Sequence, residues 1–269
     1  SRIPTTASTP SITEINETYY ALEFEDGLYS VNIVNGNTNI RDVEVKNQVS
    51  VNTNNTTGFI DPTFLEAGLF NNEIYINVNT GYAGTGSIGS GGIIGTRQVP
   101  SNNFADALAI AENRGITNFA IGASATITGI DFSAIPYTFS GVSPFIQLTL
   151  DPSANMSGCR MSELTLIGEL DGLNVLSHCS LGLVTGVSGF VEKCAFTADV
   201  VIAGPTFIFE CYSQVTGSGY PTFSCGPHDV GLRDSHGSFG FRNMTGGSHS
   251  IQVMGGRAVL EATCTGGDV

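Results

Sequence analysis

The stretch that decides the fold is residues 156–211, MSGCRMSELTLIGELDGLNVLSHCSLGLVTGVSGFVEKCAFTADVVIAGPTFIFEC. Its four cysteines, Cys159, Cys179, Cys194 and Cys211, recur at similar but unequal intervals. An apolar residue stands three positions before each of them, and in the first three copies another stands two positions after. A loose period of this size, in a stretch rich in glycine and poor in charge, predicts a β-solenoid whose coils stack like residues on like.

The repeat predicts an inward structural ladder of cysteines. Its expected members are Cys159, Cys179, Cys194, Cys211 and Cys225. The apolar flanks favour burial as small hydrophobic side chains. The chain has six cysteines, an even number, so three disulfides stay the alternative. Ser213 breaks the flanking rule and a much longer interval separates Cys225 from Cys264, so we expect the most regular coiling over residues 156–211.

Composition limits the class of protein. Of the 269 residues, 13% are charged and 41% are hydrophobic, a balance that argues against disorder and fits a turn-rich β-protein. The formal net charge is −14 and no basic patch offsets it, which weighs against nucleic-acid binding. No apolar run is long enough to cross a membrane. The chain does not begin with Met and shows no signal peptide, so we expect the ordered part of a longer polypeptide.

The sequence predicts an all-β protein in five segments. They are a linker or extended arm at residues 1–16, an antiparallel β module at 17–80, a glycine-rich connection at 81–103, a capping helix at 104–115 and a right-handed parallel β-helix at 116–269. Alternating apolar and polar residues, separated by tight-turn sequences, indicate the antiparallel module. For the last segment an immunoglobulin-like sandwich is the rival fold, but it does not predict the cysteine repeat.

The single helix has clear end signals. Asn103 is placed to cap its start, and Gly115 suits the position after its end. The expected apolar face consists of Phe104, Ala107, Leu108 and Ala111. An open solenoid end exposes its core and its unpaired strand edges, so we expect this face to cover the first coil.

Two segments carry a resemblance to a known family. Residues 95–115, GTRQVPSNNFADALAIAENRG, resemble the helical cap that opens β-helix domains in tail proteins of tailed bacteriophages. Residues 24–41, FEDGLYSVNIVNGNTNIR, followed by NQVSV at 47–51, resemble the β module that precedes that cap. The resemblance spans about residues 17–125. It implies a virion component of the tail tip, baseplate or fibre, assembled in the host cytoplasm, and it supplies no catalytic motif.

Candidate catalytic groups are few. The interval between Glu192 and Glu210 is close to one coil of the expected solenoid, so they form a possible stacked carboxylate pair of the kind that glycoside hydrolysis needs. Glu192 stands two residues before Cys194 and Glu210 one before Cys211, an offset that would point them to opposite faces. Solvated surface acids are the simpler interpretation, and no aromatic groove is evident. Residues 81–95 hold seven glycines but lack the Gly-Lys-Ser/Thr motif of a phosphate-binding loop.

The most polar part of the expected β-helix lies late in the chain. It offers a candidate protein or glycan contact surface: His228, Asp229, Arg233, Asp234, His236, Arg242 and His249. Wider turns on one exposed face are the simpler interpretation of the same residues. Cys225-Gly-Pro-His228 could begin a zinc site, but no second pair of comparable spacing follows. We therefore expect no metal and no cofactor.

Three functions remain to be separated. The first is a non-enzymatic phage tail protein that contributes to host-surface attachment. Its expected partners are other virion tail proteins, further copies of itself, for example in a trimer, and a host-surface glycan or protein. The second is a tailspike-like polysaccharide depolymerase with paired carboxylates. The third is a cell-surface β-helix adhesin, which the missing signal peptide weighs against.

Overall fold

The structure is a computed structural model, which describes residues 30–31, 50–51, 70–88, 92–215 and 219–268. The chain divides into two units, Ser1–Leu69 and Phe70–Val269. In the first unit the described residues are β1 (Ser30–Val31) and β2 (Ser50–Val51), which pair in parallel. The rest of the antiparallel module predicted for that unit, and the arm at 1–16, lie outside the described residues.

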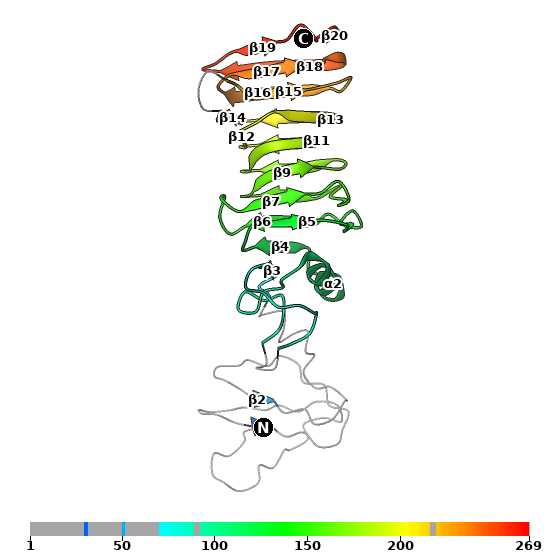
Figure 1. The fold of residues 1–269 in the computed structure, drawn as a ribbon, viewed down its shortest axis with the longest axis vertical. Helices are drawn as coiled ribbons and strands as arrows, with labels where there is room; N and C mark the ends of the chain where they lie inside the picture. Colours follow the sequence, from blue (N-terminus) through cyan, green and yellow to red (C-terminus); the bar gives the residue numbers. More distant parts are fainter. Residues whose placement is uncertain (1–29, 32–49, 52–69, 89–91, 216–218, 269) are drawn as a thin grey trace, which may run out of the picture. The chain divides into compact units, whose positions relative to one another are not determined.

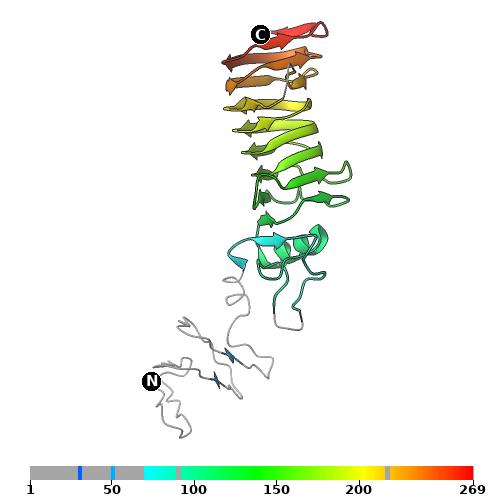
Figure 2. The same cartoon turned by 60° about the vertical axis from the view of Figure 1, so that its left-hand side comes forward.

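Over its described residues, the second unit is a parallel β-solenoid of about eight turns with the α-helix Phe104–Arg114 (Figure 1). Every pairing between its named strands is parallel, and Figure 2 shows the coils stacked in chain order. The expected parallel β-helix is therefore confirmed. Its strands are β3 (Ile74–Ile76), β4 (Asn118–Ile121), β5 (Ala125–Ile127), β6 (Thr138–Gly141), β7 (Gln147–Leu150), β8 (Arg160–Ser162), β9 (Thr165–Glu169), β10 (Asn174–Ser177), β11 (Ser180–Glu192), β12 (Ala195–Phe196), β13 (Val200–Phe209), β14 (Tyr212–Ser213), β15 (Thr222–Ser224), β16 (Val230–His236), β17 (Phe239–Arg242), β18 (Thr245–Met254), β19 (Ala258–Leu260) and β20 (Gly266–Asp268).

The solenoid begins earlier in the chain than residue 116. Strand β3, which the sequence assigned to the antiparallel module, pairs in parallel with β4. Part of the glycine-rich connection lies alongside β3: the Tyr75 N–H donates to the Gly95 carbonyl at 2.7 Å, and the Ser101 N–H donates to the Tyr75 carbonyl at 2.9 Å. A short alternating strand fits a parallel or an antiparallel neighbour equally well, so its pattern could not place the boundary.

Helix α2 (Phe104–Arg114) forms as its end signals predicted. The Asn103 side chain accepts a hydrogen bond from the Asp106 N–H at 2.8 Å, and Gly115 has a φ of 65°. The buried face consists of Phe104, Ala107, Ile110 and Ala111, with Leu108 only partly buried. These side chains belong to the same hydrophobic core as β3, against which the helix packs.

A repeated left-handed backbone position turns the chain between two strand columns. A strand column here is a set of strands from successive coils that pair on one face of the solenoid. Five residues with φ between 50° and 55° occupy it in successive coils: Glu163, His178, Lys193, Glu210 and Asp234. Side chains other than glycine, asparagine and aspartate adopt this conformation at a cost of about 1–2 kcal/mol, so its recurrence marks a corner that the stack imposes. The residue after each corner is buried and begins the next strand column.

Three of the ladder cysteines stack directly above one another after these corners. Pairing of Ser180 with Ala195, and of Ala195 with Tyr212, puts Cys179, Cys194 and Cys211 in one column. All three are buried, and all six cysteines of the chain are free thiols. The ladder interpretation is confirmed for these three residues, and the disulfide alternative is wrong.

Cys159 and Cys225 lie outside that column, which corrects the predicted five-member ladder. Cys159 precedes β8, whose Met161 pairs with Leu176 and not with Leu181. Cys225 follows β15, on a different column of the coil. Both are buried. Cys159 has the same apolar flanks, Met156 and Met161, as the stacked cysteines, so the flanks do not identify which column a cysteine joins. Cys225 lacks these flanks, since Thr222 and Pro227 occupy the two positions.

Candidate functional site

The solenoid register gathers three phenylalanines on the outside of one strand column. Phe190 of β11 pairs with Phe207 of β13, and their rings are stacked with centroids 5.6 Å apart and planes 12° apart. Phe209, two residues further along β13, lies with its centroid 6.3 Å from that of Phe207, again with nearly parallel planes. We call Phe190, Phe207 and Phe209 the ring stack. Its rings are partly exposed, because the alternate residues Val191 and Ile208 take the inward positions.

The ring stack ends at a glycine in the next coil. Gly231 of β16 pairs with Phe207, and a Cβ at Gly231 would lie only 2.8 Å from Cδ2 of that ring. The ring therefore lies against a backbone that carries no side chain. Ser250 of β18 occupies the same column one coil further on.

A groove open to solvent lies at this interruption, with a volume of about 390 Å³. Its wall includes Phe207, Gly231 and Ser250 from the interrupted column, together with Asp229 and Arg233 from β16 and the turn before it. An aromatic ring, serine hydroxyls and both signs of charge thus surround one hollow on the outside of the sheet.

The charged groups at the groove differ in how they are engaged. The Asp229 carboxylate accepts a hydrogen bond from the Ser248 N–H at 2.6 Å. Arg233 is exposed and forms no ion pair with any residue that the structure describes. Near the same face, Glu192 accepts a hydrogen bond from the Ser177 hydroxyl at 3.1 Å. Within the described part of the chain, Arg233 is therefore a guanidinium free to pair with an anion.

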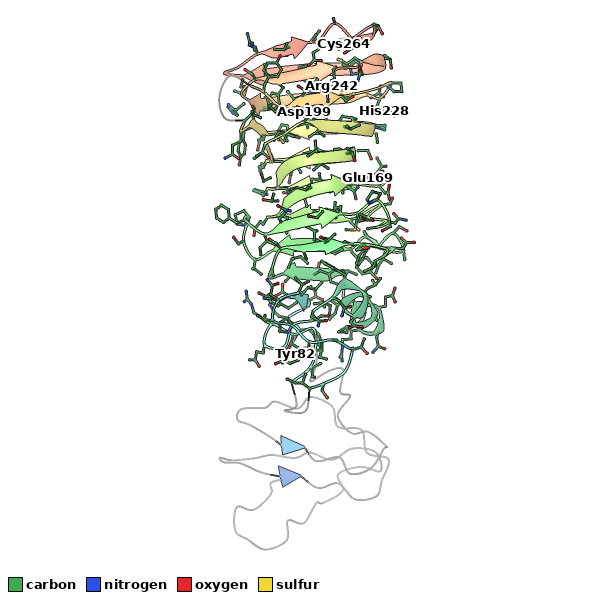
Figure 3. All side chains as sticks on the ribbon, viewed as in Figure 1. Tyr82, Glu169, Asp199, His228, Arg242 and Cys264 are labelled. Atoms are coloured by element: carbon green, nitrogen blue, oxygen red, sulfur yellow. The ribbon has the colours of Figure 1, made fainter. Side chains whose placement is uncertain are left out.

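The residues predicted as one contact surface do not share one face. Asp229, Arg233 and His249 line the groove. His236 pairs with Tyr212 in the next strand column, and Asp234 occupies a corner. Arg242 lies on β17, where its guanidinium approaches the Asp199 carboxylate at 3.4 Å; Figure 3 labels this pair away from His228. The structure therefore does not bring these residues together on one face, because a contiguous sequence is wrapped around the coil.

His249 also differs from its predicted role as a surface contact. It pairs with the inward-facing Val230, and its side chain is 6% exposed. The ring Nε2 lies 2.9 Å from the Gly246 carbonyl oxygen, while Nδ1 is buried and without a hydrogen-bond partner among the described residues. Although His249 borders the groove, it is buried, so we leave it out of the candidate site.

The two candidate carboxylates are out of register, as their offset predicted. Glu192 pairs with Phe209, and Glu210 is the next residue, at the corner. Glu210 lies 3.8 Å from the Lys193 ammonium group, and both side chains are about half exposed. An exposed pair of this kind contributes little to stability. Glu192 and Glu210 thus have different neighbours and belong to different parts of the coil.

Three of the buried cysteines, Cys159, Cys194 and Cys225, are poor nucleophiles. Burial raises the pKa of the Cys159 thiol, and that of Cys225, to about 12. Contacts with Cys179 and Cys211, and then burial, raise the pKa of Cys194 as well. Thiolates are the reactive and metal-binding form, so these thiols stay neutral at physiological pH. Among the described residues no group of three or more His, Cys, Asp or Glu side chains is placed to hold a metal ion.

The ring stack is a feature that the sequence analysis did not predict. The interval from Phe190 to Phe207 equals that from Cys194 to Cys211, so the repeat itself carried the signal. Within the part of the chain that the structure describes, no helix is long and apolar enough to cross a membrane. No family model, no curated protein and no solved structure matches this chain.

Proposed function

We propose that this chain is a non-enzymatic structural component of the tail of a tailed bacteriophage, in its tip, baseplate or fibre, and that it takes part in attachment to the host surface. The observation that carries the proposal is the order of elements among the described residues: helix α2 packs beside β3, and parallel strands stack in chain order from there to β20. This order supports the resemblance found at residues 95–115.

In this proposal helix α2 covers the first coil of a right-handed solenoid. Its buried residues Phe104, Ala107 and Ile110 share the core with Ile74 and Ile76 of β3. Without such a cover, the apolar interior of the first coil would meet water. The solenoid then acts as a rigid support that holds exposed side chains at fixed spacing.

Mass spectrometry and antibody labelling of purified phage particles that encode this chain test the virion assignment. We expect the chain in intact particles and the label on the tail. The purified chain should also compete with particles for adsorption to host cells. Absence of the chain from washed, infectious particles would overturn the assignment.

The depolymerase is the second candidate, and a reducing-end assay separates it from the first. We expect no increase in reducing ends when the purified chain is incubated with host capsule or lipopolysaccharide. Sugar release that Glu192→Gln or Glu210→Gln abolishes would overturn the non-enzymatic proposal. Light scattering of the purified chain measures whether it forms the homo-oligomer, such as a trimer, that we also propose.

A further inference from the structure

We propose that the groove beside Phe207 binds a carboxylate-bearing sugar of an anionic glycan, with the sugar ring on Phe207 and the carboxylate on Arg233. The proposal deepens the attachment role and rests on it for the source of the ligand, a host-surface polysaccharide. Five residues carry it: Phe207, Gly231, Arg233, Asp229 and Ser250.

The first step is the rigidity of the site. The inward neighbours of the ring stack and of Arg233, namely Val191, Ile208 and Leu232, are completely buried. Their strands are paired in parallel across β11, β13 and β16. Binding groups fixed in this way lose little conformational freedom when a ligand arrives, which favours recognition by a shallow site.

The second step is the shape of the gap. Phe190 and Phe207 occupy one outward column, the Phe207 ring lies against Gly231 in the next place, and Ser250 resumes the column. Strands in a sheet lie about 4.8 Å apart, so Phe207 and Ser250 are separated by roughly two such steps. The groove that Phe207, Gly231 and Ser250 help to line has a volume of about 390 Å³, which is in the range of small-ligand sites.

The third step is charge. Arg233 forms no ion pair with a described residue, on a chain whose net charge is −14. A guanidinium pairs with a carboxylate through two parallel hydrogen bonds, a geometry that a uronic or sialic acid satisfies. Asp229 and Ser250 add a hydrogen-bond acceptor and a hydroxyl for the sugar hydroxyl groups.

Isothermal titration with three acidic oligosaccharides tests the site on the purified full chain: oligogalacturonate, oligomannuronate and oligosialate. We expect at least one of these oligosaccharides to bind. Its methyl ester keeps the sugar ring but removes the charge, and it should bind at least about tenfold more weakly, because a charge-assisted hydrogen bond is lost. Maltohexaose is the uncharged comparison. Failure of all three acidic probes to bind at millimolar concentration would overturn the proposal.

Two variants assign the binding to this groove. Arg233→Gln and Phe207→Ala should each lower the affinity for the acidic oligosaccharide by about tenfold or more. Tyr212→Ala is the matched control, since Tyr212 is an exposed aromatic residue on another strand column. Arg233 is exposed, so Arg233→Gln keeps the fold even where Phe207→Ala does not. Unchanged binding in Arg233→Gln would place the glycan elsewhere.

The two proposals fail separately. A chain found on the phage tail whose groove variants adsorb to cells normally would refute the glycan site and leave the virion assignment intact. A chain absent from particles that still binds an acidic oligosaccharide through Arg233 would refute the assignment and leave the site intact.

Discussion

The backbone N–H of Cys179 donates a hydrogen bond to the Sγ of Cys194, 3.3 Å away in the next coil. The same contact recurs one step further, from the Cys194 N–H to the Cys211 Sγ at 3.3 Å. In the following coil the acceptor is a hydroxyl: the Cys211 N–H donates to the Ser235 Oγ at 3.2 Å. The stacked side chains thus satisfy backbone N–H groups that the corner leaves without a strand partner.

Replacement of Cys194 tests this role directly. We expect Cys194→Ala to lower the free energy of unfolding by about 1–3 kcal/mol, since it leaves a small cavity and removes the acceptor of the Cys179 N–H. Cys194→Ser should cost less, because Ser235 already accepts such a bond in the same column. Urea unfolding followed by circular dichroism measures both. A serine variant as unstable as the alanine variant would mean that packing alone explains the column.

Gly168 lies where the backbones of two coils come close together, and this gives a second prediction. Gly168 has a φ of 107°, and a Cβ there would lie only 2.0 Å from the Leu150 carbonyl oxygen in the coil below. We expect Gly168→Ala to destabilise the chain by more than about 3 kcal/mol, because backbone must move to admit the methyl group.

Gly129→Ala is the matched control for Gly168→Ala. Gly129 also has a positive φ, of 65°, but nothing lies within 4 Å of its added Cβ. The cost there should be the conformational strain alone, about 1–2 kcal/mol. Equal melting temperatures for the two variants would contradict the close approach of the coils at Gly168.

Thiol accessibility gives a third prediction. Cys264 is the one cysteine that is partly exposed, and the other five are buried. We expect about one thiol per folded chain to react with a water-soluble disulfide reagent at pH 8, and all six to react in denaturant. Cys264→Ser should abolish the fast reaction. Rapid labelling of Cys179 or Cys211 in the folded chain would contradict the buried column.

The sequence predicted the part of the fold that depends on local periodicity. Helix α2 was placed within one residue because Asn103 and Gly115 are strong end signals. The stacking of Cys179 on Cys194 was predicted from their flanks. Cys159 was assigned to the wrong column, since several columns of a coil share the same apolar alternation and only the length of each coil separates them.

The candidate site needed the register, which the sequence did not supply. Phe207 pairs with Gly231 across a coil that is longer than the one between Phe190 and Phe207, so counting at a constant period would not bring Phe207 and Arg233 together. The grouping of His228 to His249 failed for the opposite reason. Neighbours in sequence were taken as neighbours on a surface, although a solenoid turns each such stretch around its axis.

Asp106 makes the stability of the helix start sensitive to acid. Its carboxylate accepts hydrogen bonds from the Asn103 side-chain amide and from the Gly84 N–H, both at 2.6 Å. These two bonds, with Asn103 the larger cause, lower the pKa of Asp106 below its ordinary value of 3.8. A lowered pKa means that the folded chain holds this proton less tightly than the unfolded chain does. The stabilisation is therefore present above about pH 4 and is lost as the pH falls through the pKa of the folded state.

We expect Asp106→Asn to lower the melting temperature at pH 7, because the charge also favours the first turn of α2. The difference from the unmodified chain should shrink as the pH falls toward 3, since protonation removes the same charge from Asp106. Glu169→Gln is a suitable control, because Glu169 is an exposed carboxylate at the end of β9, away from the helix start. Calorimetric scans at pH 7, 5 and 3 give the comparison. A difference that stays constant over this range would show that the Asp106 charge does not stabilise the start of helix α2.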